Sequence, residues 1–288
     1  MIYRLHHATT YDYANPVVLG THFMHLLPRE RPGQFIREAQ LDITPAPDNR
    51  RNEIDHFGNF TTTISLTAPH KQFQVALSAT IDVLHPAPPA PERTAAWERI
   101  AQAAIERVET AEFCLASPLA TPNADIAAYA EQSFPPGEPI LTGLLDLNRR
   151  LYADMKYRSG ITNTATTAAQ VLKTRTGVCQ DYAHLMIAGL RALGLPARYV
   201  SGYLRTLPLA GEVKRRGADQ SHAWLAAWIG DAHGWVDLDP TNNLLVADEH
   251  VTLAWGRDFQ DVSPLRGIIL GGGRHALRVN VDLDPVLT

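Results

Sequence analysis

The chain has 288 residues, enough for two domains or for one large domain with an appendage. Hydrophobic residues make up 45% of the chain and charged residues 19%, which argues against a disordered protein and predicts a substantial core. The formal net charge of -4 argues against a nucleic-acid partner, and we interpret the one basic run, Lys214–Arg216, as a solvated turn.

Cysteine usage and the N-terminal sequence set the expected compartment. Cys114 and Cys179 are the only cysteines, too few for a disulfide framework, and they fit a reducing environment. The first residues, MIYRLHHATTYDY, lack the charged segment followed by an apolar segment that is typical of a secretory signal. Since no apolar run approaches the roughly 18 residues of a membrane-spanning helix, we expect a cytoplasmic protein with no membrane partner.

Residues 1–85 are predicted to form a β-rich domain. Tyr3, Leu5 and His7 occupy alternate positions, as in a strand with one buried face. Three later segments are rich in β-branched and aromatic residues: QLDIT, NFTTTISLT and FQVALSATIDVL. Because turn sequences such as PAPDNRRN and HFGN separate these segments, we expect a small antiparallel β-sandwich.

A proline-rich linker, residues 86–92, separates this domain from the rest of the chain. Its four prolines favour an extended, semi-rigid spacer. Residues 93–288 are predicted to form the second unit, which begins with helices and ends with an alternating strand, HALRVNVDL. The predicted helical segments are 94–110, 123–134 and 138–155.

The most clearly predicted helix covers residues 178–193. Counted from Cys179, one helical face is apolar, and Gly194 and Pro196 are expected to end the helix. The residues of this face are Tyr182, Ala183, Met186, Ile187 and Leu190. The segments predicted as strands after it are ARYVSGYL (197–204), SHAWLAAWI (221–229) and GWVDLDPT (234–241).

Cys179 has two interpretations. Cysteine is often a core residue, and Cys179 lies on the apolar face, so a structural thiol is the first. The second follows from its place at the start of a helix, where backbone N–H groups have no intrahelical partner and the helix dipole is positive. These groups favour a thiolate and can also stabilise an oxyanion. Cys179 is therefore a candidate nucleophile.

A cysteine nucleophile needs a histidine base and a group that orients the base. His222 and Asp239 fit these roles because they lie on adjacent predicted strands. If a two-residue hairpin turn joins the strands, His222 lies opposite Asp239; a turn two residues longer shifts the partner to Thr241 and leaves Asp239 diagonal. Asp237 is the alternative acid. A satisfied, half-buried His222 and a turn-forming Asp239 are the structural alternatives.

Three segments resemble the core of transglutaminase-like proteins: GVCQDYAHLMIAGLRALGLPARYVSGYL, SHAWLAAW and GWVDLDPTNN. The similarity is to the bacterial branch of that superfamily, and DHFGN (55–59), GRDFQDVSPLRG (256–267) and GGG (271–273) agree with it. The resemblance covers nearly the whole chain, with the core motifs in residues 157–245. It implies an α+β fold: a papain-like core, in which a helix packs on an antiparallel sheet, preceded by the small β-sandwich domain.

By this resemblance Cys179 is the nucleophile, His222 the base and Asp239 the orienting acid, since the acid of the family precedes a pair like Pro240-Thr241.

Other residues are weaker candidates. The resemblance suggests Tyr157 as an aromatic oxyanion donor, although packing is the commoner role of a tyrosine. Trp224 and Trp235 are candidates to line a substrate cleft, although a packed sheet face is commoner for them as well. We interpret His184 as a structural hydrogen-bonding residue and Cys114 as a core or partly exposed thiol.

The implied activity is cysteine-dependent acyl transfer on a peptide or protein substrate, with no cofactor. A peptidase or amidase that forms a thioester is favoured over a cross-linking transferase. No acidic cluster has the spacing of a calcium loop, which argues against calcium dependence.

Two alternatives to this activity are a peptide-binding scaffold without catalysis and a metal site formed by Cys179, His222 and Asp239. The metal site is disfavoured because no paired metal-ligand spacing accompanies these residues. The sequence leaves open the substrate, hydrolysis against transamidation, the role of the N-terminal domain and the oligomeric state.

Overall fold

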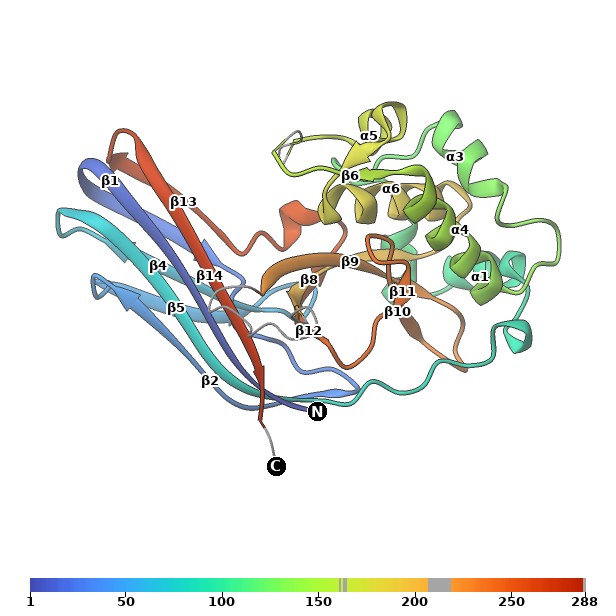
Figure 1. Ribbon diagram of the computed structural model, residues 1–288, viewed down its shortest axis with the longest axis horizontal. Coiled ribbons are helices and arrows are strands. Elements are labelled where there is room, and N and C mark those ends of the chain that lie inside the picture. The colour runs from blue at the N-terminus through green and yellow to red at the C-terminus, as the bar shows by residue number, and fades with distance from the viewer. Residues whose placement is uncertain (161, 163–164, 207–218, 287–288) are drawn as a thin grey trace, which may run out of the picture.

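The structure is a computed structural model that describes residues 1–160, 162, 165–206 and 219–286. A long curled β-sheet forms one side of the molecule, and a second sheet covered by helices forms the other (Figure 1). The basic run Lys214–Arg216 lies outside the described residues.

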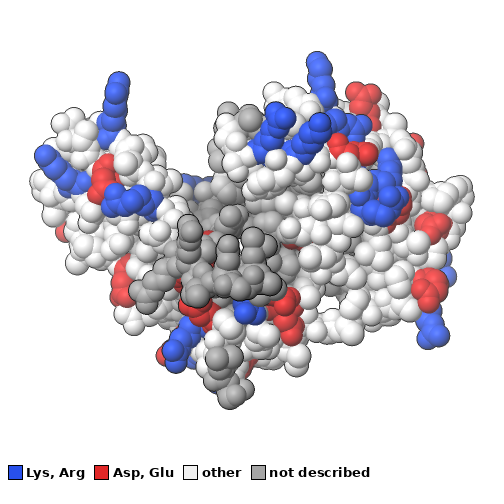
Figure 2. Space-filling model, viewed as in Figure 1, with Lys and Arg blue, Asp and Glu red and all other residues white. Residues whose placement is uncertain are grey.

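Charges of both signs are mixed on the visible surface. On the described part of the face in Figure 2, Lys and Arg side chains lie among Asp and Glu side chains. Within the described ranges, no helix has both the length and the apolar character needed to cross a membrane.

The N-terminal sheet is built around one long strand, β1 (Ile2–Met24). Its first half pairs with β5 and β14, and its second half pairs with β4 and β13, all antiparallel. Strands β2 and β3 extend the sheet beyond β5 and β4. The bounds of these strands are β2 (Gln34–Thr44), β3 (Asn49–Ile54), β4 (Phe60–Leu66), β5 (His70–Val83), β13 (Leu265–Gly271) and β14 (His275–Pro285).

The sheet curls where β1 changes its pairing register, between Asp12 and Val17. Beside this bend the chain passes from β13 to β14 through Gly271–Gly273, whose φ angles of 98°, 79° and 66° favour glycine. A Cβ atom on Gly272 would also lie 3.0 Å from Val17 and 3.1 Å from Tyr13. The GGG segment is therefore a compact connection against the bent strand.

The curled sheet shares its core with the second sheet, because Tyr203, Val251 and Leu253 of that sheet belong to the same buried cluster. Tyr3, Leu5 and His7 are all buried, which confirms the predicted strand with one buried face. The core also contains Leu77 of β5 and Ile64 of β4, which come from the two halves of the sheet. The N-terminal region is thus one curled sheet whose apolar face packs partly on itself and partly on the second sheet.

Two features of this sheet differ from the sequence-based expectation. Residues 49–54, which overlap the predicted turn, form strand β3, and all six residues are exposed. A strand without a buried face has no apolar alternation, so the pattern did not reveal it. The C-terminal strand, expected to belong to residues 93–288, is β14 and pairs with β1 of the N-terminal sheet. Alternation identifies a strand but not the sheet that it joins.

Three buried histidines make the fold sensitive to acid. Burial lowers the pKa of His7, His22 and His184 to about 4, whereas the unfolded side chains titrate near 6.5. Their contribution to stability is therefore fully present above pH 6.5 and is lost as pH falls toward 4, because the unfolded chain binds more protons in that range. We expect the urea concentration at the unfolding midpoint to fall between pH 7 and pH 4.5.

Two variants give the controls for this experiment. In His22→Phe, a phenyl ring can take the place of the imidazole that stacks on Phe73 at 4.2 Å between centroids. Because the phenyl ring binds no proton, this variant should lose less stability in acid than the wild type. His233 is exposed, and His233→Gln should lose as much stability as the wild type. An equal pH dependence in all three proteins would contradict the assignment to buried histidines.

The proline-rich segment leads into the helical part of the molecule through the short helix η1 (Pro91–Arg93). Each of the three predicted helical segments contains at least one helix, and α5 is an additional one that the sequence analysis did not predict. The bounds are α1 (Trp97–Ala104), α2 (Val108–Ala111), η2 (Glu112–Cys114), α3 (Ala124–Glu131), α4 (Ile140–Asp154) and α5 (Ala168–Thr174).

Helix α6 (Cys179–Ala192) is central and matches the predicted helix over residues 178–193. It packs on strands β8 and β9 and also on helices α3 and α5, so it is buried from Asp181 to Arg191. Gly194, with φ of 73°, ends the helix as predicted. The helix is thus buried all round rather than along one face.

The second sheet has the order β11-β10-β9-β8-β12, and its pairs are antiparallel. With α6 packed on it, the papain-like arrangement is confirmed. The sheet strands are β8 (Ala197–Leu204), β9 (Gln220–Trp228), β10 (Trp235–Asp239), β11 (Leu244–Leu245) and β12 (His250–Gly256). The remaining elements are β6 (Lys156–Tyr157), β7 (Thr176–Gly177) and η3 (Phe259–Asp261).

The hairpin between β9 and β10 sets the position of Asp239 relative to His222. Its loop covers residues 230–233, because the N–H of Ile229 donates to the carbonyl of Gly234 at 2.9 Å. Of the two turn lengths that the sequence left open, the longer one is therefore confirmed. In the resulting register Asp239 lies diagonal to His222 rather than opposite it.

A buried ion pair joins the N-terminal region to the second sheet. Arg31, in the segment after β1, donates from both terminal nitrogens to the carboxylate of Asp237 in β10, at 2.5 and 3.1 Å. The amide of Gln34 exchanges two hydrogen bonds with the backbone of Thr252 in β12, at 2.7 and 2.8 Å. The N-terminal region therefore contacts the sheet that carries His222 and Asp239.

Removal of Arg31 should destabilise the protein strongly. The Arg31 and Asp237 side chains are only 9% and 3% exposed, so Arg31→Met removes the ion-pair partner of a buried carboxylate. We expect a loss of about 3–5 kcal/mol in the free energy of unfolding, measured by urea denaturation. The pair Arg37–Asp82 is the matched control, since its side chains are 53% and 33% exposed. Arg37→Met should cost about 0–1 kcal/mol, and equal losses in the two variants would contradict this account.

Candidate active site

Cys179 is half-buried and is the first residue of α6. The backbone ladder of the helix starts with the N–H groups of Asp181 and Tyr182, which donate to the carbonyl of Val178 at 2.9 and 3.1 Å. The N–H groups of Cys179 and Gln180 precede this ladder and lie at the positive end of the helix dipole. This is the setting that the sequence predicts for a nucleophile.

Asp181 fixes the turn that presents the thiol. Its Oδ2 accepts hydrogen bonds from the N–H of Val178 and the hydroxyl of Thr162, each at 2.7 Å. Burial raises the pKa of Asp181, although these two hydrogen bonds oppose the rise. Gly177 leaves room for the carboxylate, since a Cβ atom there would lie 2.6 Å from the Cβ of Asp181. The glycine and the aspartate thus form one compact turn ahead of Cys179.

Tyr157, the predicted oxyanion donor, lies in β6 beside this turn. Strand β6 runs parallel to β7 and pairs Tyr157 with Gly177, two positions before Cys179. The side chain is 50% exposed. Partial burial and the charge of Cys179 raise the pKa of Tyr157, so its hydroxyl keeps the proton that an oxyanion donor needs. The structure therefore leaves Tyr157 as a candidate for this role.

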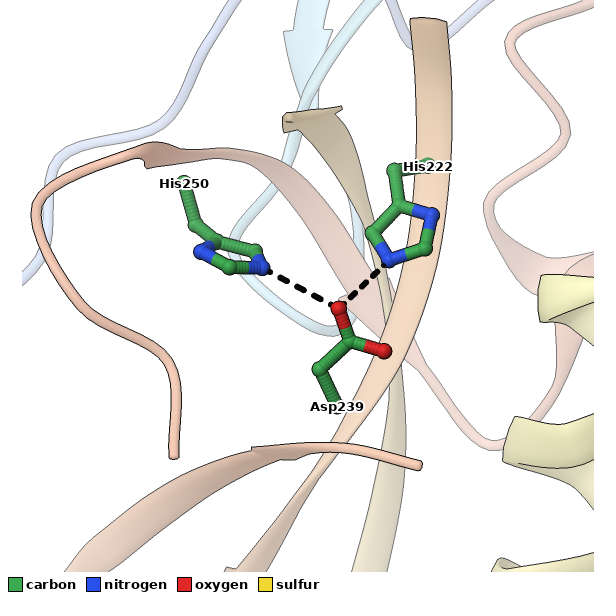
Figure 3. A group of neighbouring side chains, drawn as sticks. All are labelled: His222, Asp239 and His250. Atoms are coloured by element: carbon green, nitrogen blue, oxygen red, sulfur yellow. Dashed lines mark hydrogen bonds and ion pairs between the residues drawn. The ribbon is translucent and has the colours of Figure 1, made fainter. Parts of the chain in front are cut away.

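His222 of β9 connects the sheet to the thiol. Its Nε2 lies 2.7 Å from Oδ2 of Asp239, and both side chains are buried (Figure 3). The Cys179 side chain is also close enough to His222 to raise the pKa of its ring. Because Asp239 engages Nε2, the ring nitrogen left for the sulfur is Nδ1. The three residues that the sequence predicts are thus brought together from α6, β9 and β10.

The electrostatics of the site favour a charged histidine. Burial alone would lower the pKa of His222, but the hydrogen bond to Asp239 and the charges of Asp239 and Cys179 raise it to about 10. Burial alone would raise the pKa of Asp239, but hydrogen bonds from His222, His250 and Asn242 hold it well below its usual range. A cation between two groups that can carry negative charge is the ionic arrangement of a cysteine protease site.

Sequence reasoning missed two residues that bind the Asp239 carboxylate. Nδ2 of Asn242 donates to Oδ2 at 2.7 Å, and Nε2 of His250 lies 3.3 Å from the same oxygen. Asn242 could have been found, because an aspartate before Pro240 commonly bonds to the residues that follow it. His250 is one of 12 histidines, and no local pattern marks it.

The alternative acid, Asp237, has other partners. Besides Arg31, it accepts a hydrogen bond from Nε1 of Trp224 at 3.0 Å. Trp224 is fully buried, so the prediction that it lines an open cleft is wrong. Trp235 is half-buried and lines a cavity of about 400 Å³ beside the proline-rich segment.

The surroundings of His184 and Cys114 are those of structural residues. His184 is fully buried, and its Nε2 accepts the N–H of Phe259 at 3.1 Å, as expected of a structural hydrogen-bonding residue. Cys114 is half-buried, with its sulfur 3.4 Å from the carbonyl oxygen of Gly194, and burial raises the pKa of its thiol to about 11. Neither residue has the setting of a nucleophile.

In the part of the chain that the structure describes, one group has the composition of a metal site. The possible ligand atoms of His222, Asp239 and His250 all lie within 4.8 Å of one another. The distance of 2.7 Å from His222 to Asp239 is that of a hydrogen bond, whereas two tetrahedral zinc ligands at about 2.0–2.1 Å from the metal lie roughly 3.3 Å apart. Hydrogen bonding therefore accounts for this group better than a metal does.

Two family models match the chain. The model described as the bacterial transglutaminase-like N-terminal region matches residues 3–82, and that of the transglutaminase-like superfamily matches residues 128–240. The second range contains Cys179, His222 and Asp239.

Similar proteins occur in several bacteria. An uncharacterised protein of Mycobacterium tuberculosis is 38% identical over 98% of this chain and 92% of its own length, and one of Mycobacterium leprae is 31% identical over 97% of each. A protein-glutamine gamma-glutamyltransferase of Pseudomonas aeruginosa is 42% identical over 69 residues, 24% of this chain and 10% of that protein.

Among solved structures, a candidate cysteine protease of Cytophaga hutchinsonii shares the fold. The TM-score is 0.75 at 24% identity, with 100% of this chain and 92% of that chain covered. The match includes both the curled sheet and the helical unit, since it extends over the whole chain.

Proposed function

The chain belongs to the transglutaminase-like superfamily, and on this premise we propose that it is a cysteine-dependent enzyme that transfers the acyl group of a peptide or carboxamide. One observation carries the proposal: the imidazole of His222 lies between the carboxylate of Asp239, at 2.7 Å, and the thiol of Cys179 at a helix N-terminus. A nucleophile, a base and an orienting acid in this order are what acyl transfer requires.

In the first proposed step, the thiolate of Cys179 forms a bond to the carbonyl carbon of the substrate, and the carbonyl electron pair moves to oxygen. The N–H of Cys179 and the hydroxyl of Tyr157 are the proposed donors to this oxyanion. When the intermediate collapses, the carbon–nitrogen bond breaks and the Nδ1 proton of His222 passes to the leaving amine. The products are a thioester on Cys179, a neutral His222 and a free amine.

In the second proposed step, neutral His222 activates the nucleophile that resolves the thioester. Nδ1 accepts a proton from water while the water oxygen bonds to the acyl carbon. The carbon–sulfur bond then breaks, which releases a carboxylic acid and restores the thiolate of Cys179 beside a protonated His222. The low pKa of Asp239 keeps its carboxylate charged throughout, so the acid orients the ring without taking its proton.

We favour water over an amine in this second step, which makes the protein a peptidase or amidase acting on a peptide or protein. Water needs no binding site of its own, whereas an amine must be held in a cleft that limits access of water. The name of the Pseudomonas aeruginosa relative, protein-glutamine gamma-glutamyltransferase, makes an amine the competing nucleophile, although the similarity covers 24% of this chain.

The proposal can be tested by mass spectrometry of a peptide library incubated with the protein, with and without a primary amine. Cleaved or deamidated peptides, absent in Cys179→Ala, would support the peptidase or amidase. Amine incorporation as the main product would show a transferase instead. Peptides that bind without any change in mass would support a scaffold and overturn the proposal.

A further inference from the structure

The Asp239 carboxylate has a second histidine beside it that the proposed reaction does not use. Nε2 of His250 lies 3.3 Å from Oδ2 of Asp239, the oxygen that also binds His222 (Figure 3). His250 is 2% exposed and begins β12, which lies at the opposite end of the sheet order from β10 and β11. The contact is therefore made by the return of the chain after β11 and not by pairing between neighbouring strands.

The register of the hairpin explains why Asp239 needs this support. Because Asp239 is diagonal to His222, its carboxylate must be held in one direction to reach the ring. The N–H groups of Thr241 and Asn242 bind Oδ1 at 3.0 and 3.2 Å, and the Asn242 amide binds Oδ2 at 2.7 Å. These donors come from the two residues that follow Pro240. Apart from His222, His250 is the described residue that binds the carboxylate from another strand.

The surroundings of His250 indicate which nitrogen carries a proton. Its Nδ1 is buried without a hydrogen-bond partner among the residues that the structure describes. A bare acceptor nitrogen is tolerated in such a place better than an unpaired N–H. With Nε2–H directed at the carboxylate of Asp239, His250 is a donor to the acid and not a second base.

The ring of His250 is itself held in place. It packs edge to face on Trp224, with 5.2 Å between ring centroids and an interplanar angle of 81°. The indole N–H of Trp224 binds Asp237, and Asp237 binds Arg31 of the N-terminal region. The position of His250 thus depends on a buried chain of contacts that begins outside the second sheet.

We propose that His250 is a positioning residue: its ring donates to Asp239 and holds the carboxylate toward His222, so that Nδ1 of His222 stays aligned with Cys179. This inference rests on the proposed function. It also gives the N-terminal region a part in the site, because Arg31 supports the contacts that orient His250.

The test is the rate at which iodoacetamide alkylates Cys179 at pH 7, followed by mass spectrometry in folded variants of the full chain. His250→Phe keeps an aromatic ring but removes the hydrogen-bond donor. We expect alkylation to be about tenfold to hundredfold slower, which is the range found when a residue that orients a metal-binding side chain is replaced. His250→Gln places an amide N–H near the carboxylate and should restore most of the rate. His70→Gln, which alters a buried histidine of the N-terminal sheet, should react like the wild type.

Two results would overturn the role of His250. A wild-type rate in His250→Phe is one, and an equal loss in His250→Phe and His250→Gln is the other, since it would reflect packing alone. If His250→Phe does not fold, His250→Asn replaces it, because its amide is too short to reach Asp239 from the same backbone. Failure of the proposed function is distinguishable. In that case Cys179 would be alkylated slowly in the wild type, and at the same slow rate in His222→Ala.

Discussion

Cys179→Ala is expected to reduce cleavage of the best library substrate by about a millionfold, to the level left by binding and oxyanion stabilisation. Without the sulfur there is no nucleophile to attack the carbonyl carbon, so no thioester forms. The measurement is the initial rate of product formation by mass spectrometry, with enzyme in excess so that a single turnover is visible.

Cys114→Ala is the matched control for this variant. The Cys114 thiol contacts backbone carbonyls, one of them at Gly194 just past the end of α6 that is opposite Cys179, and burial raises its pKa to about 11. Its removal should leave the rate unchanged within about twofold, a small effect compared with the typical cost of losing a catalytic group. More than a tenth of the activity in Cys179→Ala, or its loss in Cys114→Ala, would refute the assignment of the nucleophile.

Asp239→Asn is expected to reduce the rate by about ten-thousandfold, as replacement of the orienting acid does in other triads. The amide can present its NH₂ group to Nε2 of His222, which would place the ring proton on Nδ1 of a neutral ring. It also removes the charge that raises the pKa of His222 to about 10. The pKa of His222 should therefore fall toward 6.5 in the variant. As pH rises, the remaining activity of Asp239→Asn should decline at a lower pH than the activity of the wild type.

A second buried carboxylate, Asp258, provides the control that distinguishes a loss of catalytic rate from a loss of stability. Asp258 is 1% exposed and caps η3 through the N–H of Gln260 at 2.9 Å. Asp258→Asn should lower the melting temperature while the rate at 25 °C stays within about threefold of the wild type, because the residue is no part of the triad. A rate in Asp239→Asn within tenfold of the wild type would contradict the orienting role of Asp239.

The features that depend on a local sequence pattern could be predicted from the sequence. The helix over residues 178–193 and the strand over 197–204 have clear apolar periodicity and appear as α6 and β8. The order of Cys179, His222 and Asp239 could also be predicted, because either even turn length keeps the histidine and the acid on the same face of the sheet. The confirmed turn is the longer one, so the prediction did not depend on guessing its length.

The features that were missed depend on the path of the chain in space. The exposed strand β3 has no apolar face, and β13 and β14 return from the far end of the chain to pair with β1. His250 reaches Asp239 only because the chain crosses the sheet after β11. Trp224 lies on the expected face, but its indole is bound to Asp237 and buried, which periodicity cannot reveal.

The central claim is that His222 holds Cys179 as a reactive thiolate, and the rate of alkylation by iodoacetamide at neutral pH tests it most directly. Cys114 serves as the internal reference in the same protein. We predict rapid labelling of Cys179 at neutral pH, far faster than that of Cys114, and loss of this advantage in His222→Ala. Slow labelling of Cys179 at the same rate in the wild type and in His222→Ala would contradict the account.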